Sequence, residues 1–147
     1  MILFSLCVFS QNEEVDWLSF EALETKLSEK PKKVFIHLYA DWCDYCKKME
    51  EDVYSNPQIS ELLSENYYAV KFNVESRDSV FFGGKKFTNP NVGKSRQANH
   101  EIAELLAKRD NEPITLPTVL FFNEDFILEK RLFRYIPPKE LLDLLKQ

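Results

Sequence analysis

Cysteine is scarce in this sequence, and its scarcity excludes one class of small protein. Cys7, Cys43 and Cys46 are the three cysteines among 147 residues. A small fold cross-linked by disulfides carries more cysteines, normally in even number. One close pair with a third cysteine far away is instead typical of reactive thiol chemistry.

An excess of positive charge is missing as well. Lysine and arginine number 19 against 24 acidic residues, which gives a net charge of −5, and no segment is strongly basic. Since nucleic acids are bound through basic stripes, we expect no nucleic-acid partner. Apolar residues are plentiful at 44%, and 12 of them are phenylalanines. This composition favours a globular domain with a packed core over a disordered chain.

The apolar run MILFSLCVF at the start is too short to span a bilayer. We expect residues 1–11 to be a secretory signal peptide, cleaved near Ser10 or Gln11, so that no stable membrane insertion follows cleavage. The basic residues that normally precede such a run are missing, which leaves an ordered N-terminal strand as an alternative. A lipid anchor at Cys7 is a weaker alternative, because the bulky Leu6 precedes it.

Helices and strands alternate along residues 12–147, which we expect to form one domain. The expected helices cover residues 12–30, 43–55 and 95–109, and two further helices begin at 56–57 and at 137–138. The expected strands cover 34–39, 67–74, 118–122 and 126–133, and a hairpin is expected at 80–87. Interleaved strands and helices predict an α/β fold, with a central mixed sheet flanked by helices. The last two strands must be antiparallel, because a tight turn joins them.

Glycine is rare, and all three glycines fall within residues 75–94, where Gly83-Gly84 predicts the turn of the hairpin. We expect this segment to cap the edge of the sheet or to hold a partner. Asp16 is expected to cap the first helix. In the helix at 95–109, apolar residues such as Leu105 are expected to point inward.

Cys43 and Cys46 stand where a buried strand gives way to a helix. The i, i+3 spacing places both sulfurs on one side of a helical turn, close enough to form a disulfide. At the helix N-terminus, free amide groups and the helix dipole favour the thiolate of Cys43. We therefore assign Cys43 as the attacking residue and Cys46 as the resolving residue.

Two other interpretations of the pair are weaker. Half of a zinc site would need His37 and His100 as further ligands, and these lack the spacing of a zinc finger, so we expect no metal. A purely structural disulfide would close a very short loop and restrict the unfolded chain little.

The surroundings of the pair resemble the thioredoxin superfamily. ADWCDYCKK at 40–48 is similar to that family's active-site motif, LPTVLFF at 116–122 to its cis-proline loop and the next strand, and KFNV at 71–74 to its third strand. These similarities cover most of residues 13–147. The chain resembles in particular the exported bacterial thioredoxin-related and disulfide-isomerase-like proteins. The resemblance implies a thioredoxin-like fold with residues 75–94 as an insertion before the third main helix, and a periplasmic location.

The resemblance also implies roles for further residues. Pro117 would follow a cis peptide bond, face the sulfurs and, with Leu116, present backbone groups to a peptide. Trp42 and Tyr45 would belong to the substrate-facing surface. No cofactor is implied beyond the redox-active disulfide. The implied partners are protein thiols or disulfides and an unidentified redox partner, for a protein expected to be a monomer.

Several residues depart from the family pattern. His37 stands where thioredoxin has a buried acid that accepts the proton of the resolving thiol, and Lys71 matches the lysine beside that acid. A histidine can move protons near neutral pH, so we hypothesise that His37 tunes the resolving thiol; the alternative is a core histidine. Asp44 and Tyr45 replace the usual residues between the cysteines. Arg134 replaces a glycine that lines the peptide groove.

These observations favour an enzyme that reduces, forms or rearranges protein disulfides by dithiol exchange. Asp44 opposes a thiolate and so favours a more reducing couple, whereas a protonated His37 would act the other way, so the direction stays open. One alternative is a binding module whose cysteines are vestigial or hold a metal. Another is a cytoplasmic thioredoxin that keeps its first residues.

Overall fold

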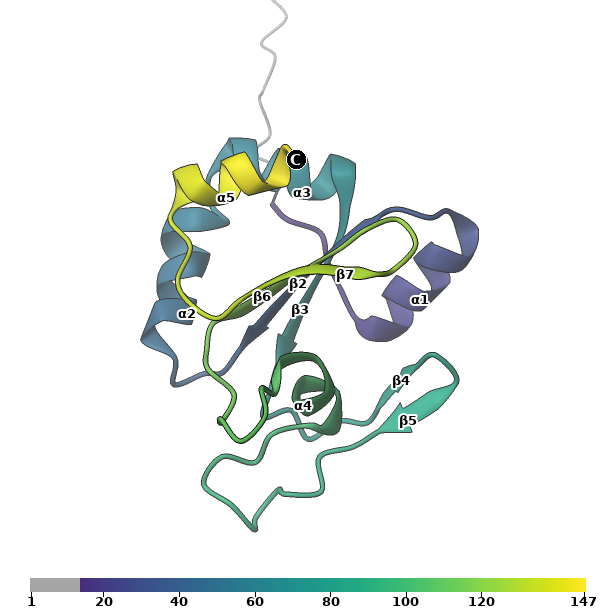
Figure 1. The fold of residues 1–147 in the computed structure, drawn as a ribbon, viewed down its shortest axis with the longest axis vertical. Coiled ribbons are helices and arrows are strands. Elements are labelled where there is room, and N and C mark those ends of the chain that lie inside the picture. Colours follow the sequence, from purple (N-terminus) through teal and green to yellow (C-terminus); the bar gives the residue numbers. More distant parts are fainter. Residues whose placement is uncertain (1–13) are drawn as a thin grey trace, which may run out of the picture.

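A mixed five-stranded sheet forms the centre of the protein (Figure 1). The structure is a computed structural model and describes residues 14–147. The expected signal peptide and Cys7 lie outside the described residues. The strands are β1 (Trp17–Leu18), β2 (Lys33–Tyr39), β3 (Tyr67–Asn73), β6 (Thr118–Phe122) and β7 (Leu128–Leu132), in the order β1-β3-β2-β6-β7. The first three run parallel, β6 is antiparallel to β2, and β7 is antiparallel to β6. The predicted mixed sheet is confirmed.

Helices cover both faces of this sheet (Figure 1). One face packs against α1 (Phe20–Glu29) and α4 (Glu101–Ala107). The other packs against α2 (Asp44–Lys48), its π-helical continuation η1 (Met49–Val53), α3 (Pro57–Asn66) and α5 (Pro138–Leu145). In the described residues, no helix is both long enough and apolar enough to cross a membrane.

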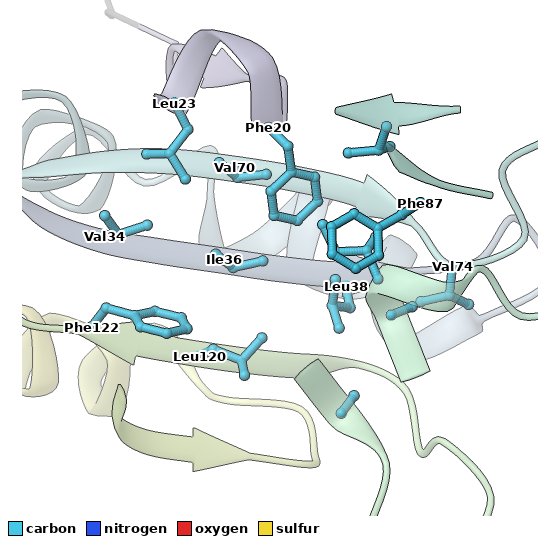
Figure 2. Close-up of a cluster of buried hydrophobic side chains, with 14 of the residues drawn as sticks. Phe20, Leu23, Val34, Ile36, Leu38, Val70, Val74, Phe87, Leu120 and Phe122 are labelled. Carbon is cyan, nitrogen blue, oxygen red and sulfur yellow. The ribbon is translucent and has the colours of Figure 1, made fainter. Parts of the chain in front are cut away.

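Strand β2 contributes to both cores because side chains alternate between the two faces of a strand. Figure 2 shows Val34, Ile36 and Leu38 below Phe20 and Leu23 of α1. Phe35 belongs to the opposite core, among residues of η1, α3 and α5. Residues 34–39 are apolar apart from His37 because this strand is buried on both sides.

The predicted hairpin is present as β4 (Val80–Phe82) and β5 (Lys85–Phe87), which pair in antiparallel fashion. Gly83 and Gly84 form its turn with φ of 61° and 73°, values that favour glycine. The hairpin lies against α1, where carboxylates of Glu21 and Glu24 accept hydrogen bonds from the backbone N–H groups of Phe81 and Gly83, each at 2.9 Å. The interpretation as a cap over one part of the sheet is favoured by this packing.

The prediction of a helix over residues 12–30 is wrong at its start. Trp17 and Leu18 pair with β3 as an edge strand, and Asp16 caps nothing. Helix α1 begins only after Ser19, whose hydroxyl accepts a hydrogen bond from the N–H of Ala22 at 3.1 Å. Pairing with a neighbouring strand therefore outweighs the helical spacing of the first apolar residues.

The prediction of a helix over residues 95–109 is also wrong at its start. Helix α4 begins at Glu101, with His100 as its N-cap. Upstream, the backbone N–H of His100 donates to the carbonyl of Val74 at 2.7 Å, and the side-chain amide of Asn89 donates to the carbonyl of Ala98. These bonds hold the chain in a non-helical path. Leu105 was expected inside but is 68% exposed, since Ile102, Ala103 and Ala107 form the buried side of this short helix.

Candidate active site

Cys43 and Cys46 lie at the end of β2 and form a disulfide, with their Cα atoms 5.2 Å apart. The turn before them is closed by a hydrogen bond from the N–H of Cys43 to the carbonyl of Ala40 at 3.1 Å. Both cysteines are nearly inaccessible, with 4% and 2% of their surface exposed. Access to the disulfide therefore depends on the residues that surround it.

Cys43 is the N-cap of α2, and its sulfur accepts a hydrogen bond from the backbone N–H of Cys46 at 3.2 Å. This N–H is one of the groups that a helix leaves unpaired at its first turn. In the reduced protein, a donor pointed at Cys43 Sγ stabilises negative charge there. The geometry supports Cys43 as the attacking cysteine.

Trp42 precedes Cys43 and Tyr45 lies between the two cysteines, and their side chains are 57% and 62% exposed. The indole N–H of Trp42 donates to Glu75 Oε1 at 3.1 Å, which fixes the ring against the segment after β3. The ring of Tyr45 lies 6.2 Å from that of Tyr135, measured between centroids, and Lys48 Nζ lies 5.0 Å from the Tyr135 centroid. Two exposed aromatic side chains thus border a buried disulfide.

Pro117 lies at the same edge of the sheet as the cysteines. The strand it precedes, β6, is antiparallel to β2, and Thr118 pairs with Leu38 near the end of β2 (Figure 1). The peptide bond between Leu116 and Pro117 is cis. Pro117 is buried and Leu116 is half-buried. Register alone therefore brings the proline loop to the end of the strand from which Cys43 follows.

His37 is completely buried on the α3 and α5 side of β2. Its ring stacks on Tyr39, with centroids 6.1 Å apart, and meets Tyr54 edge-on at 5.1 Å. Within the described residues, neither ring nitrogen has a hydrogen-bond partner. Burial, and secondly the charge of Lys71, lower the pKa of His37 from 6.5 to about 3. The ring is therefore neutral near pH 7 and cannot stabilise a thiolate by its charge; a role in proton transfer stays a prediction.

Lys71 pairs with His37 in the register of the two strands, but its ammonium group binds elsewhere. Lys71 Nζ lies 2.8 Å from Glu50 Oε1 in a half-buried ion pair. Glu50 and Tyr54 line a cavity of about 450 Å³ together with Lys71 and Trp17. Burial, and next the Glu50 carboxylate, raise the pKa of Tyr54. Glu50 is not among the residues predicted from the sequence, although its position four residues after Cys46 places it on the same side of the helix.

Arg134, at the position of the groove glycine, is half-exposed and forms an ion pair with Glu140 of α5. Among the described residues, no group of three or more histidine, cysteine, aspartate or glutamate side chains is arranged to hold a metal ion. The arrangement assembled by the fold is thus a dithiol pair, two exposed aromatic rings and a proline loop at one edge of the sheet.

Residues 20–147 match a family described as a thioredoxin-like domain. Among curated relatives, the thiol:disulfide interchange protein DsbD of Escherichia coli (strain K12) is 35% identical over 71 residues, which are 48% of this chain and 12% of that protein. The corresponding protein of Shigella boydii serotype 4 is 34% identical over 71 residues, with the same coverage. This chain therefore spans only a small part of these relatives.

Solved structures share the fold at lower sequence identity. A thioredoxin from Thermus thermophilus superimposes with a TM-score of 0.61 and 23% identity, covering 92% of this chain and 87% of that chain. DsbH oxidoreductase gives 0.60 and 13% identity over 91% and 83%. The oxidised C-terminal domain of DsbD from Neisseria meningitidis gives 0.55 and 18% identity over 86% and 90%.

Proposed function

We propose that this chain, which belongs to the thioredoxin-like domain family, is a thiol–disulfide oxidoreductase whose Cys43 and Cys46 exchange electrons with cysteine pairs of exported proteins. The observation that carries the proposal is the disulfide at the strand–helix junction. The exposed rings of Trp42 and Tyr45, and the loop of Leu116 and Pro117, supply a surface on which a peptide can lie.

The proposed reaction begins with the reduced protein. The thiolate of Cys43 attacks one sulfur of a substrate disulfide, that bond breaks, and the departing substrate sulfur takes up a proton. A mixed disulfide now joins Cys43 to the substrate. Cys46 loses its proton, and its thiolate attacks Cys43 Sγ, forming the Cys43–Cys46 disulfide and releasing the second substrate thiolate. Two electrons have passed to the substrate, and the reverse sequence oxidises a substrate dithiol.

Substitution of each cysteine separates the two roles. We expect reduced Cys46→Ser to accumulate a mixed disulfide with protein substrates that contain a disulfide, because the resolving thiol is gone, and Cys43→Ser to form almost none. The wild-type chain is expected to accelerate insulin reduction by dithiothreitol, whereas both variants lose this activity by about 100-fold or more. Gel mobility under non-reducing conditions and insulin turbidity measure these outcomes.

The alternative of a binding module predicts different results from the same material. Absence of insulin reduction, together with one zinc or copper ion bound per chain, would contradict the exchange reaction. Where exchange is observed, the reduction potential gives its direction. A value near −270 mV indicates a reductant, and values of about −120 to −180 mV indicate an oxidant or isomerase.

We also propose that the protein acts outside the cytoplasm. Support comes from the apolar first residues of the sequence and from the names of its relatives, which are thiol:disulfide interchange proteins. An oxidising compartment is where protein disulfides persist and need enzymes of this kind.

A further inference from the structure

The chain segment that leads into Pro117 lies outside every helix and strand, between α4 and β6. Fixing such a segment has an entropic cost, so contacts with the rest of the fold must hold it. Its position matters because Leu116 and Pro117 reach the edge of the sheet where the cysteines lie. Ile114 and Leu116 of this segment pack against the core, and the side chain of Arg109 contacts Thr115 between them.

The guanidinium group of Arg109 joins two separate parts of the chain, Phe133 and the segment of Glu112 and Thr115. Its Cζ lies 3.9 Å from the centroid of the Phe133 ring, directly after β7. Its Nη2 donates to Thr115 Oγ1 at 3.2 Å and lies 3.1 Å from Glu112 Oε2. A planar guanidinium can stack on a ring and donate from its edge at once, which a lysine ammonium cannot do.

The backbone of Arg109 is itself fixed. The N–H of Glu112 donates to the carbonyl of Arg109 at 2.8 Å, and the two residues form an isolated bridge. Asp110 between them takes a φ of 42°, which turns the chain sharply. The guanidinium group therefore extends from a closed turn directly after α4, and not from a free loop.

Thr115 is held from its other side as well. The hydroxyl of Thr118 donates to the carbonyl of Thr115 at 2.6 Å. Thr118 is buried and pairs with Leu38 of β2. Leu116 and Pro117 are the two residues between these attachments, so the contacts of Thr115, together with the packing of Leu116 against the core, determine where both of them lie.

We propose that Arg109 is a positioning residue for exchange with protein disulfides, acting through Thr115 on the proline loop. The inference rests on the proposed function and adds a residue to it. A loop held in one conformation binds an extended peptide with a smaller loss of entropy than a mobile loop does. A small disulfide that needs no peptide groove gains nothing from this order. Arg109 therefore distinguishes protein substrates from small ones.

The test compares two disulfides in the full-length chain carrying Arg109→Gln. We expect kcat/KM for insulin reduction to fall about five- to tenfold, mainly through KM, the size of effect expected when one charge-assisted hydrogen bond is lost. The rate constant for the reduced enzyme with 5,5′-dithiobis(2-nitrobenzoate) should stay within about twofold of wild type. Arg109→Lys should reduce insulin as slowly as Arg109→Gln, because lysine cannot replace the stacked, forked contact.

Arg131→Gln is the matched control. Arg131 lies 5.9 Å from the same Phe133 centroid and donates to the carbonyl of Leu106, not to the proline loop. Arg131→Gln removes the same charge as Arg109→Gln, so a general electrostatic effect on substrates would appear in both variants. Equal insulin kinetics for Arg109→Gln and Arg131→Gln overturns the proposal, and so does a parallel fall in the small-disulfide rate.

A second variant and a second readout keep the inference testable apart from activity. Thr115→Val removes the acceptor at similar volume, and its effect on insulin reduction should not add to that of Arg109→Gln. Hydrogen exchange at the amide of Leu116 should be about tenfold faster in Arg109→Gln but unchanged in Arg131→Gln. Unchanged exchange at Leu116 in both variants contradicts the positioning role. A wild-type chain that does not reduce insulin refutes the proposed function, while the exchange measurement still decides whether Arg109 orders the loop.

Discussion

His37 is an ionisable side chain enclosed by aromatic rings, and its burial links folding to pH. The folded protein holds the pKa of His37 at about 3, whereas an unfolded chain has a value near 6.5. Between pH 3 and pH 6.5, His37 is protonated in the unfolded state but stays neutral in the folded state. The contribution of neutral His37 to the free energy of unfolding is therefore fully present above pH 6.5. It is lost as the pH falls, by at most about 1.4 kcal/mol per pH unit.

Replacing His37 by Phe should remove this acid sensitivity. We expect the free energy of unfolding of the wild type to fall by about 2 kcal/mol more than that of His37→Phe between pH 7 and pH 5. Urea unfolding at the two pH values measures the difference. His37→Gln, which is uncharged and smaller, should show the same loss of pH dependence whatever its absolute stability. Parallel pH dependence in the wild type and both variants means that His37 takes up a proton while folded.

The residues that the sequence identifies best are those whose chemistry depends on local spacing. Cys43 and Cys46 are recognisable because i, i+3 spacing after an apolar run is itself the arrangement that lets the sulfurs meet. Arg109 gave no such signal, since Thr115 and Phe133 reach it from other segments. The ion pair of Glu50 with Lys71 likewise depends on how a helix lies over a strand.

The hairpin of β4 and β5 depends on acidic side chains of α1 as well as on its own apolar residues. Val80 and Phe87 belong to the core, and Phe82 packs edge-on against Phe20 with centroids 5.6 Å apart. Phe81, on the other side of the strand, is 54% exposed. The carboxylates of α1 supply acceptors for hairpin N–H groups that would otherwise face solvent.

Removing both acceptors with Glu21→Ala and Glu24→Ala should loosen the hairpin without affecting the dithiol. We expect trypsin to cleave after Lys85 or Lys86 about 30-fold faster, since each of the two lost hydrogen bonds contributes about 1 kcal/mol. Insulin reduction should remain within about twofold of wild type. Glu29→Ala, on the exposed end of α1, is the control and should be cleaved at the wild-type rate. Equal cleavage of all three proteins would show that apolar packing alone holds the hairpin.

Element boundaries were predicted less well than the elements themselves, for two physical reasons. The first apolar residues of the predicted helix 12–30 have helical spacing, but Trp17 and Leu18 pair with the edge of β3. Spacing along the chain carries no information about such distant strands. At Ala98 and His100 the backbone bonds to the side chain of Asn89 and to the carbonyl of Val74, which helix propensity does not register.

At the scale of the whole molecule, the order of strands and helices was enough to predict a covered mixed sheet. The run at 34–39 is apolar apart from His37 and correctly indicated a buried strand, because burial on both faces leaves little polar alternation. The order of the strands in the sheet was not predicted, since hydrophobic spacing does not state which strands are neighbours.

The proposed location concerns the entire chain and is tested on protein made in cells. We expect the purified protein to lack about the first ten residues and to be released with the contents of the periplasm. Intact-mass measurement and cell fractionation provide the result. A chain that retains Met1 and stays with cytoplasmic proteins excludes export. The control is Leu3→Arg, which places a charge in the apolar run and should prevent cleavage of the first ten residues.

The amide of Cys46 that points at Cys43 Sγ has a kinetic consequence. By stabilising negative charge on this sulfur, it makes Cys43 a good leaving group as well as a good nucleophile. A substrate joined to Cys43 can therefore depart by two routes: Cys46 displaces it, or a second thiol of the substrate displaces Cys43. Both routes shorten the lifetime of the covalent complex. We therefore expect the mixed disulfide between Cys43 and a substrate to be short-lived.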